Sequence, residues 1–165
     1  MTAVADSSPL IALSALSCLE LLKVLFSGLL IPEAVYREVV LQGQGKPGAR
    51  EVREAEWIRQ AQVRDQQAVE ALIGRFRFER GEAEAIVLVK EAGVTWIILD
   101  EDDQGPRRYA RELGISVIGT LGVLLRAKRE GHVASLGDKL EELKASGFWI
   151  DPALAMSVLR AAGEG

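Results

Sequence analysis

The chain has 165 residues, and its 20 basic and 24 acidic side chains leave a formal net charge of −4. This length suits one domain, and the shares of hydrophobic (48%) and charged (27%) residues exclude a disordered or fibrous class. Cys18 is the only cysteine and His132 the only histidine, which excludes an internal disulfide and multi-cysteine zinc sites. Because no signal-peptide pattern is present and charged residues interrupt the most apolar stretch, we expect a cytoplasmic protein that does not bind a membrane.

The spacing of apolar residues predicts short strands that alternate with longer helices. The predicted strands are apolar and lie at 2–5, 29–31, 94–99 and 115–118. The predicted helices lie at 7–26, 32–42, 65–78, 82–92, 107–113, 120–130, 136–144 and from 152 onward. We expect a break near Ser17 and another at Gly81, a loop at 43–48 (GQGKPG), and either a helix end or an edge strand at 56–63.

This alternation is typical of an α/β protein with a central, mainly parallel sheet and helices on both faces. The segment 94–99 (VTWIIL) supports the prediction, because it is apolar throughout, as strands covered on both faces usually are. In such sheets ligands bind at the carboxyl ends of the strands. Polar residues that directly follow the strands are therefore the candidates for function.

Five acidic residues stand at strand ends or on apolar helix faces. Asp6 and Asp100 each follow a predicted strand, Glu38 and Glu82 share helix faces with apolar residues, and Glu84 also faces inward in one orientation of its helix. A carboxylate among apolar side chains must be protonated, paired or bound to a cation. Mg²⁺ suits such a cluster, and the reaction it indicates is metal-assisted hydrolysis of phosphodiester bonds.

Each of these acids also has a purely structural interpretation. Asp6 precedes Ser-Ser-Pro and is a candidate cap for the helix that follows, while Glu38 has Arg37 beside it as a partner. The run of four acids at 100–103 has the composition of a solvated acidic turn. Composition alone leaves the metal site and the structural ion pairs as open alternatives.

Five segments resemble a PIN-domain family in the right order over most of the chain: Asp6 with the SSPLIALSAL that follows it, LLIPEAVYREV, RGEAEAIVLV, WIILDED and VIGTLGVLLRAKREG. More narrowly, they resemble a prokaryotic subfamily related to VapC-type toxins and long known as a domain of unknown function. The resemblance implies a three-layer PIN-like fold in a single domain over 1–165, with a helical extension from about 132. It also implies an Mg²⁺- or Mn²⁺-dependent ribonuclease that cleaves single-stranded RNA, plausible as the toxin partner of a small antitoxin protein.

Carried over by motif, the resemblance implies which residues form the site. The catalytic acids would be Asp6, Glu38, Glu82 and Asp100, and the metal ligands Asp6, Asp100, Glu82 and Glu84, where Glu84 is the second choice for the middle-helix acid. Secondary candidates at the same end are Ser8, Thr120 and Asp103. The subfamily passes quickly from its acid pair to a Gly-Arg-Arg stretch, whereas this chain has the longer DEDDQGPRR. Whether Glu101 or Asp103 joins the cluster therefore stays open.

Three arginines, Arg107, Arg108 and Arg111, follow the acidic run and share a helix face. They are candidates for binding RNA phosphates, with pairing to Glu112 or simple solvation as the alternative. The apolar segment 13–26 has enough apolar positions to support a homodimer as well as the chain's own core. The three tryptophans, Trp57, Trp96 and Trp149, are not interleaved with basic residues, which favours core packing over base stacking.

Two other classes of protein remain as alternatives. A phospho-accepting receiver domain also binds Mg²⁺ in an acidic pocket, but it needs an acid pair after its first strand, where this chain has Asp6 alone. An inert PIN-fold module for binding or dimerisation would need none of the acids that this chain retains. Of the three, we expect the ribonuclease.

Overall fold

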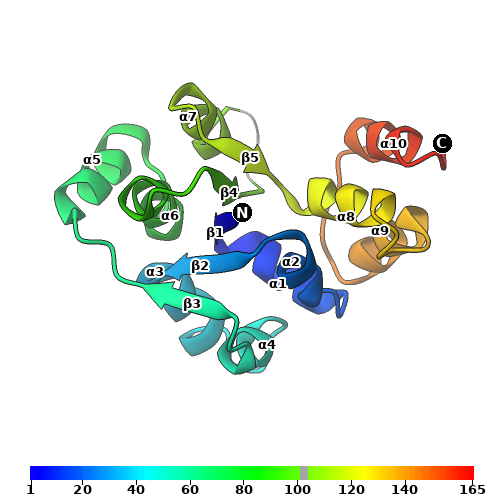
Figure 1. Cartoon of the computed structure of the whole chain (residues 1–165), viewed down its shortest axis with the longest axis horizontal. Coiled ribbons are helices and arrows are strands. Elements are labelled where there is room, and N and C mark those ends of the chain that lie inside the picture. The colour runs from blue at the N-terminus through cyan, green and yellow to red at the C-terminus, as the bar shows by residue number, and fades with distance from the viewer. Residues whose placement is uncertain (101–103) are drawn as a thin grey trace.

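The computed structural model describes residues 1–100 and 104–165, and its centre is a parallel sheet covered by helices on both faces (Figure 1). The strand order is β3-β2-β1-β4-β5, and every neighbouring pair is parallel. The strands are β1 (Thr2–Ala5), β2 (Gly28–Pro32), β3 (Ile58–Ala61), β4 (Trp96–Ile98) and β5 (Ser116–Ile118). This architecture confirms the predicted α/β fold.

The helices connect the strands and then continue beyond the sheet. In chain order they are α1 (Ser7–Ala15), α2 (Glu20–Leu25), α3 (Glu33–Tyr36), the π-helix η1 (Arg37–Leu41), α4 (Ala49–Glu54), α5 (Gln66–Phe76), α6 (Arg80–Ala92), α7 (Pro106–Glu112), α8 (Thr120–Arg129), α9 (Leu136–Ala145) and α10 (Pro152–Ala161). In Figure 1, α8, α9 and α10 lie together on one side of the sheet, and α5 and α6 lie on the other.

The three layers follow from the alternation of side chains along the strands. In β1, Ala3 and Ala5 belong to one buried cluster and Val4 to a second one on the opposite face. The first cluster contains side chains of α1, α2 and α8–α10, and the second contains side chains of α5, α6 and α7. Both faces of the central strands are therefore apolar.

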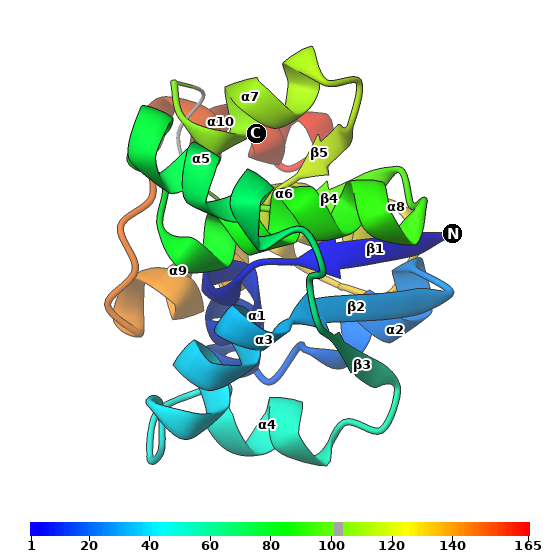
Figure 2. The same cartoon turned by 90° about the vertical axis from the view of Figure 1, so that its left-hand side faces the viewer.

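The strand register brings the ends of β1 and β4 together. Ala5 pairs with Ile98, and the backbone N–H of Asp6 donates to the carbonyl of Ile98 at 3.0 Å. In Figure 2 the strands run in one direction, and α1 and α3 lie at the edge toward which they point. Residues that follow β1 and β4 consequently share one edge of the sheet.

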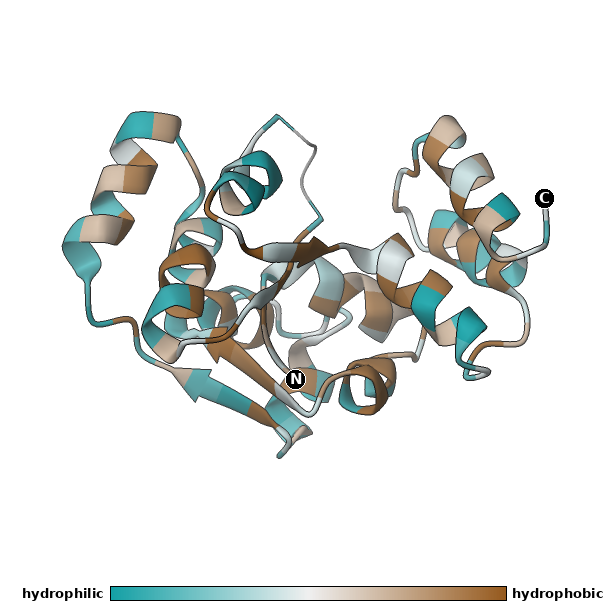
Figure 3. Ribbon diagram, turned by 45° about the horizontal axis from the view of Figure 1, so that its top comes forward, coloured by the Kyte–Doolittle hydropathy of each residue, from teal (hydrophilic) through white to brown (hydrophobic). Residues whose placement is uncertain are grey.

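Several details differ from the sequence predictions. The segment 56–63 forms the edge strand β3, which is largely hydrophilic in Figure 3. Gly81 does not break a helix but is the second residue of α6, and the break lies earlier, at Arg77, whose φ of 58° is left-handed. The break near Ser17 is confirmed, since Ser17 has a φ of 55°.

The prediction that all three tryptophans pack in the core is wrong for Trp149. Its side chain is 83% exposed, while its neighbours Phe148 and Ile150 pack against the core. Trp96, in contrast, packs edge-on against Phe26 with ring centroids 6.1 Å apart. No helix in the described part of the chain is both long and apolar enough to span a membrane.

Candidate active site

Asp6 lies at the junction of β1 and α1 and is 5% exposed. It occupies the N-cap position of α1, but its side chain makes no capping hydrogen bond to that helix. The helix-cap interpretation of Asp6 therefore fails, and its carboxylate is directed elsewhere. A buried carboxylate needs compensation from a hydrogen-bond donor or a cation.

Glu38 comes close to Asp6 beside Gly81 of α6. A Cβ atom added to Gly81 would lie 3.3 Å from Asp6 Oδ1 and 3.5 Å from Glu38 Oε2, so both oxygens face the same small space. The Ser7 hydroxyl donates to Glu38 Oε2 at 2.9 Å and fixes its orientation. Arg37 pairs with Glu33 at 3.1 Å, which removes the interpretation of Glu38 as the partner of Arg37.

Glu82 and Glu84 are both buried and both accept hydrogen bonds from backbone N–H groups at helix starts. Glu82 Oε1 accepts from the N–H of Glu79 at 2.8 Å in a capping box at the start of α6. Glu84 Oε1 accepts from the N–H of Ala34 at 3.1 Å and so ties α6 to α3. Each acid therefore has a structural partner at the start of a helix.

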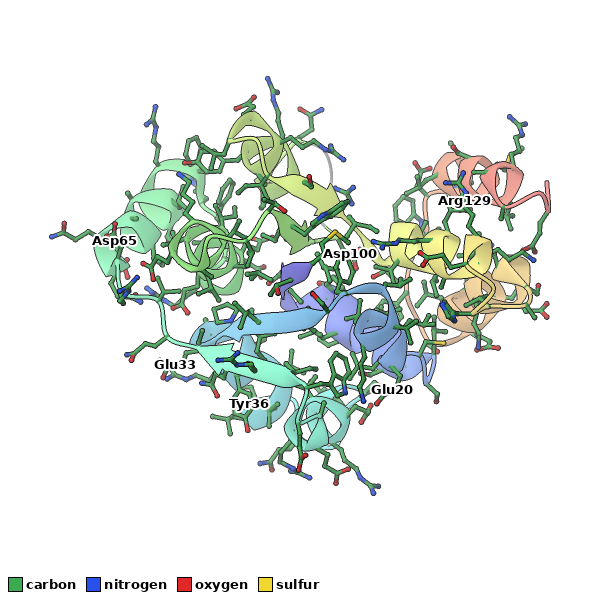
Figure 4. The ribbon with its side chains drawn as sticks, viewed as in Figure 1. Glu20, Glu33, Tyr36, Asp65, Asp100 and Arg129 are labelled. Carbon is green, nitrogen blue, oxygen red and sulfur yellow. The ribbon has the colours of Figure 1, made fainter. Side chains whose placement is uncertain are left out.

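Asp100 is held by the start of α8. The Thr120 hydroxyl donates to Asp100 Oδ2 at 2.5 Å, and the Thr120 N–H donates to Oδ1 at 2.6 Å. Figure 4 shows Asp100 near the centre of the molecule, close to the first turn of α8. The close approach needs Gly119, since a Cβ there would lie 2.8 Å from Asp100 Oδ1.

A family model, DUF3368, described as a PIN domain, matches residues 2–164. The chain belongs to the PIN-domain family. PIN domains typically have nuclease activity. No curated protein matches the chain.

The structure separates the three arginines of this PIN domain. Arg107 reaches the carboxylate edge, where its Nη1 donates to the carbonyl of Leu99 at 3.2 Å. A Cβ on Gly119 would lie 2.7 Å from that same nitrogen, which places the Arg107 guanidinium beside Asp100. Arg108 instead pairs with Glu112 at 3.1 Å on the surface, and Arg111 is exposed. Of the three, Arg107 is the one that lies at the acids.

The carboxylates fit a divalent cation in kind, because all the donors are oxygens and the glycine at position 81 leaves their near side uncovered by a side chain. Across residues 1–100 and 104–165, however, no three acidic, cysteine or histidine side chains lie close enough together to hold one ion. Asp103 and Glu101 lie outside the described residues. The described part of the PIN domain thus presents two neighbouring acidic groups, Asp6 with Glu38 and Asp100 with Thr120.

Sequence reasoning missed three residues that shape this site. Of the two adjacent serines, it expected Ser8 to supply a hydroxyl to the site, whereas the hydroxyl that contacts Glu38 belongs to Ser7, and Ser8 is half-buried. It treated Gly81 as a helix breaker, although its missing side chain leaves the space between two carboxylates. Gly119 precedes Thr120 in the GTLG segment, and a glycine directly before a predicted helix was the available signal.

Proposed function

We propose that this PIN domain is a metal-dependent endoribonuclease that hydrolyses phosphodiester bonds of single-stranded RNA. The observation that supports the proposal best is the shared space beside Gly81, into which Asp6 and Glu38 both present an oxygen. Asp100 follows the strand next to β1, so its carboxylate belongs to the same edge of the sheet. Converging carboxylates repel one another unless a cation neutralises them, which favours a metal site over a purely structural cluster.

The position of each residue suggests its role in the proposed reaction. Asp6 and Asp100 would hold Mg²⁺ or Mn²⁺, and Glu38, Glu82 and Glu84 would complete the site directly or through water. When bound, such an ion lowers the pKa of a water ligand and stabilises negative charge on a phosphoryl oxygen. Ser7 and Thr120 orient Glu38 and Asp100 through their hydroxyls. Arg107 has the place and charge to bind a phosphate of the RNA strand.

The biological setting belongs to the same proposal and rests on the motif resemblance. The protein would act in the cytoplasm as the toxin of a toxin–antitoxin pair, held inactive by a small cognate antitoxin, and would form a homodimer. Within the apolar segment 13–26, Leu13, Leu22 and Phe26 are buried in the chain's own core and Val24 is 54% exposed. An interface at this segment would therefore use exposed residues such as Val24.

Cleavage of a labelled single-stranded RNA tests the proposal. We expect cleavage with Mg²⁺ or Mn²⁺, none in EDTA, and loss of cleavage in the variants Asp6→Asn and Asp100→Asn. Asp138→Asn is the matched control, because it makes the same change at an exposed position of α9. Undiminished cleavage by both Asp6→Asn and Asp100→Asn would refute the assignment.

The two alternatives lead to different observations. A receiver domain has the strand order 2-1-3-4-5, whereas this sheet has the order 3-2-1-4-5, so the topology argues against it. An inert module would show no rise in melting temperature with Mn²⁺, whereas an ion bound only by the folded state raises it. A melting-temperature shift that Asp6→Asn removes would favour the nuclease.

A further inference from the structure

The segment 75–80 reads RFRFER and joins α5 to α6. It alternates arginine with phenylalanine, a pattern that combines cations with aromatic rings over a few residues. Phe76 is 41% exposed, and Arg75 and Arg77 are exposed on either side of it, while Phe78 turns into the core. An exposed ring between two arginines is an unusual surface for a folded protein, which normally buries phenylalanine.

The aromatic rings of this segment form a cluster with α7. Phe76 stacks on Phe78 with ring centroids 5.3 Å apart and contacts Tyr109 at 5.1 Å, and Phe78 meets Tyr109 edge-on at 5.8 Å. The guanidinium carbon of Arg75 lies 5.2 Å from the centre of the Phe76 ring. The cluster therefore holds the exposed part of Phe76 rigidly and places a cation against it.

The backbone at Arg77 shows that its position is conformationally costly. Arg77 follows the last residue of α5 with a φ of 58° and a ψ of 32°, a left-handed conformation in which glycine is usual at helix ends. An arginine there costs folding stability that a glycine would avoid. Side chains kept at such positions are candidates for function.

The charges of this segment are available to a ligand. Arg80 is engaged in a close ion pair with Glu70, which raises the pKa of Arg80. In contrast, Arg75 and Arg77 form no ion pair with any side chain of residues 1–100 or 104–165. Two unpaired cations beside an exposed ring complement a chain that carries both phosphates and flat bases.

Two helices, α6 and α7, link this surface to the candidate active site. Tyr109 lies on α7 two residues after Arg107, which stands beside Asp100. Phe76 is separated by a short turn from the first residues of α6, where Gly81 faces Asp6 and Glu38. Figure 2 shows α5 and α7 on the same side of the molecule, above the first strands. A strand bound at Arg107 could thus extend across Tyr109 to Phe76.

We infer that Arg75, Phe76, Arg77 and Tyr109 form a basic aromatic surface that binds the RNA strand beyond the cleaved bond. One base stacks on the Phe76 ring or on the guanidinium plane of Arg75, and Arg77 contacts a phosphate. The inference rests on the proposed ribonuclease function, since it extends the substrate path of that site. The ligand is a single strand, because the bases of a duplex stack on one another and leave no face free for an aromatic ring.

Fluorescence anisotropy in EDTA, which prevents metal-dependent cleavage, measures the binding of a labelled RNA of about 12 nucleotides, within the site sizes usual for such surfaces. We expect Phe76→Ala to weaken binding about 5- to 20-fold and Phe76→Tyr to retain it, since stacking on one base contributes this much. Leu113→Ala, at an exposed apolar residue just after α7, is the matched control and should bind like the wild type. A trinucleotide is too short to reach from Arg107 to Phe76, so it should bind the wild type and these three variants with equal affinity.

A second pair of variants separates binding from folding. Arg77→Gly should raise the melting temperature, because it relieves the left-handed arginine, and yet weaken RNA binding. The double change Arg75→Gln with Arg77→Gln should weaken the salt dependence of RNA binding. The slope of the logarithm of the binding constant against the logarithm of the salt concentration should fall by about 0.7 for each phosphate that the variant no longer binds. A purely structural role for these residues would not lower affinity while stability rises.

The outcomes distinguish this inference from the proposed function. One outcome is that the wild type cleaves RNA while Phe76→Ala and the double arginine variant bind it as tightly as the wild type does. That result would refute the proposed binding surface and leave the nuclease assignment intact. If the wild type neither binds nor cleaves single-stranded RNA, both fall. Tighter binding to duplex than to single-stranded RNA, or binding of an acidic peptide in place of RNA, also overturns the stacking surface.

Discussion

The smallest change that tests the carboxylate arrangement is Gly81→Ala. The added Cβ would lie 3.3 Å from Asp6 Oδ1, 3.4 Å from Val35 Cγ2 and 3.5 Å from Glu38 Oε2. The first distance is shorter than a comfortable contact, so the surroundings would have to move by a few tenths of an ångström. The methyl group would occupy the space between two carboxylate oxygens that we assign to the metal site.

Stability and activity should respond differently to this change. Alanine is favoured over glycine in a helix by about 1 kcal/mol, which offsets most of the cost of the tight contacts. We therefore expect the free energy of unfolding to change by less than about 1 kcal/mol. Misplacing reacting groups by about 1 Å costs about 100-fold in rate, so shifts of a few tenths of an ångström, with the methyl between the acids, should slow cleavage about 10-fold.

Urea unfolding and initial rates of RNA cleavage, measured on the same preparations, provide the test. Gly74→Ala is the matched control, because Gly74 lies in helix α5 with no atom within 4 Å of its Cβ position. That variant should gain up to about 1 kcal/mol and cleave at the wild-type rate. If Gly81→Ala cleaves RNA as fast as the wild type and shows the same Mn²⁺-induced shift in melting temperature, the acids do not share a site beside Gly81.

Three further predictions concern the acids and their partners. Thr120→Val removes the hydroxyl that donates to Asp100 Oδ2 and should cost about 1.5–3 kcal/mol in urea unfolding and slow cleavage, whereas Thr120→Ser should preserve both. Glu84→Ala should destabilise the fold by about 1–3 kcal/mol, because the N–H of Ala34 loses its acceptor; Glu84→Gln keeps that oxygen, so a reduced Mn²⁺ shift in Glu84→Gln alone would identify a metal ligand. The backbone N–H groups of Gly137 and Leu136, with Lys128, hold the pKa of Glu164 at about 2, below its ordinary value of 4.5. The ionised Glu164 therefore stabilises the fold fully above pH 4.5, and this stabilisation is lost as the pH falls toward 2. The melting temperature of the wild type should therefore fall more steeply than that of Glu164→Gln between pH 5 and pH 2, and parallel curves would contradict this.

The strands at the centre of the sheet could be predicted because their composition leaves few alternatives. Ile97, Ile98 and Leu99 in one segment and Ala3, Val4 and Ala5 in the other are fully buried, so these strands read as continuous apolar runs. The edge strand β3 could not be distinguished from a helix end, because Arg59 and Gln60 face solvent and the segment lacks a continuous apolar run. The positions of Asp6 and Asp100 at one edge followed directly from the parallel topology.

Side-chain directions near the acids were beyond sequence reasoning. Ser7 and Ser8 are adjacent hydroxyls, and only the actual φ and ψ at the start of α1 decide which one meets Glu38. Glu38 itself lies on a π-helix, whose wider turn shifts the helix face that an α-helical spacing predicts. Gly81 was misjudged because glycine is unfavourable in helices on average, whereas here a neighbouring carboxylate leaves no comfortable space for a side chain.

The central place of β1 has a consequence for the protein during its synthesis. The ribosome makes β1 early, but its hydrogen-bonded neighbour β4 ends at Ile98, and Asp100 follows later still. A nascent chain cannot bring Asp6 and Asp100 to one edge until the segment through β4 has also left the exit tunnel. The order of the strands along the chain thus delays the assembly of the proposed nuclease centre until β4 has been synthesised.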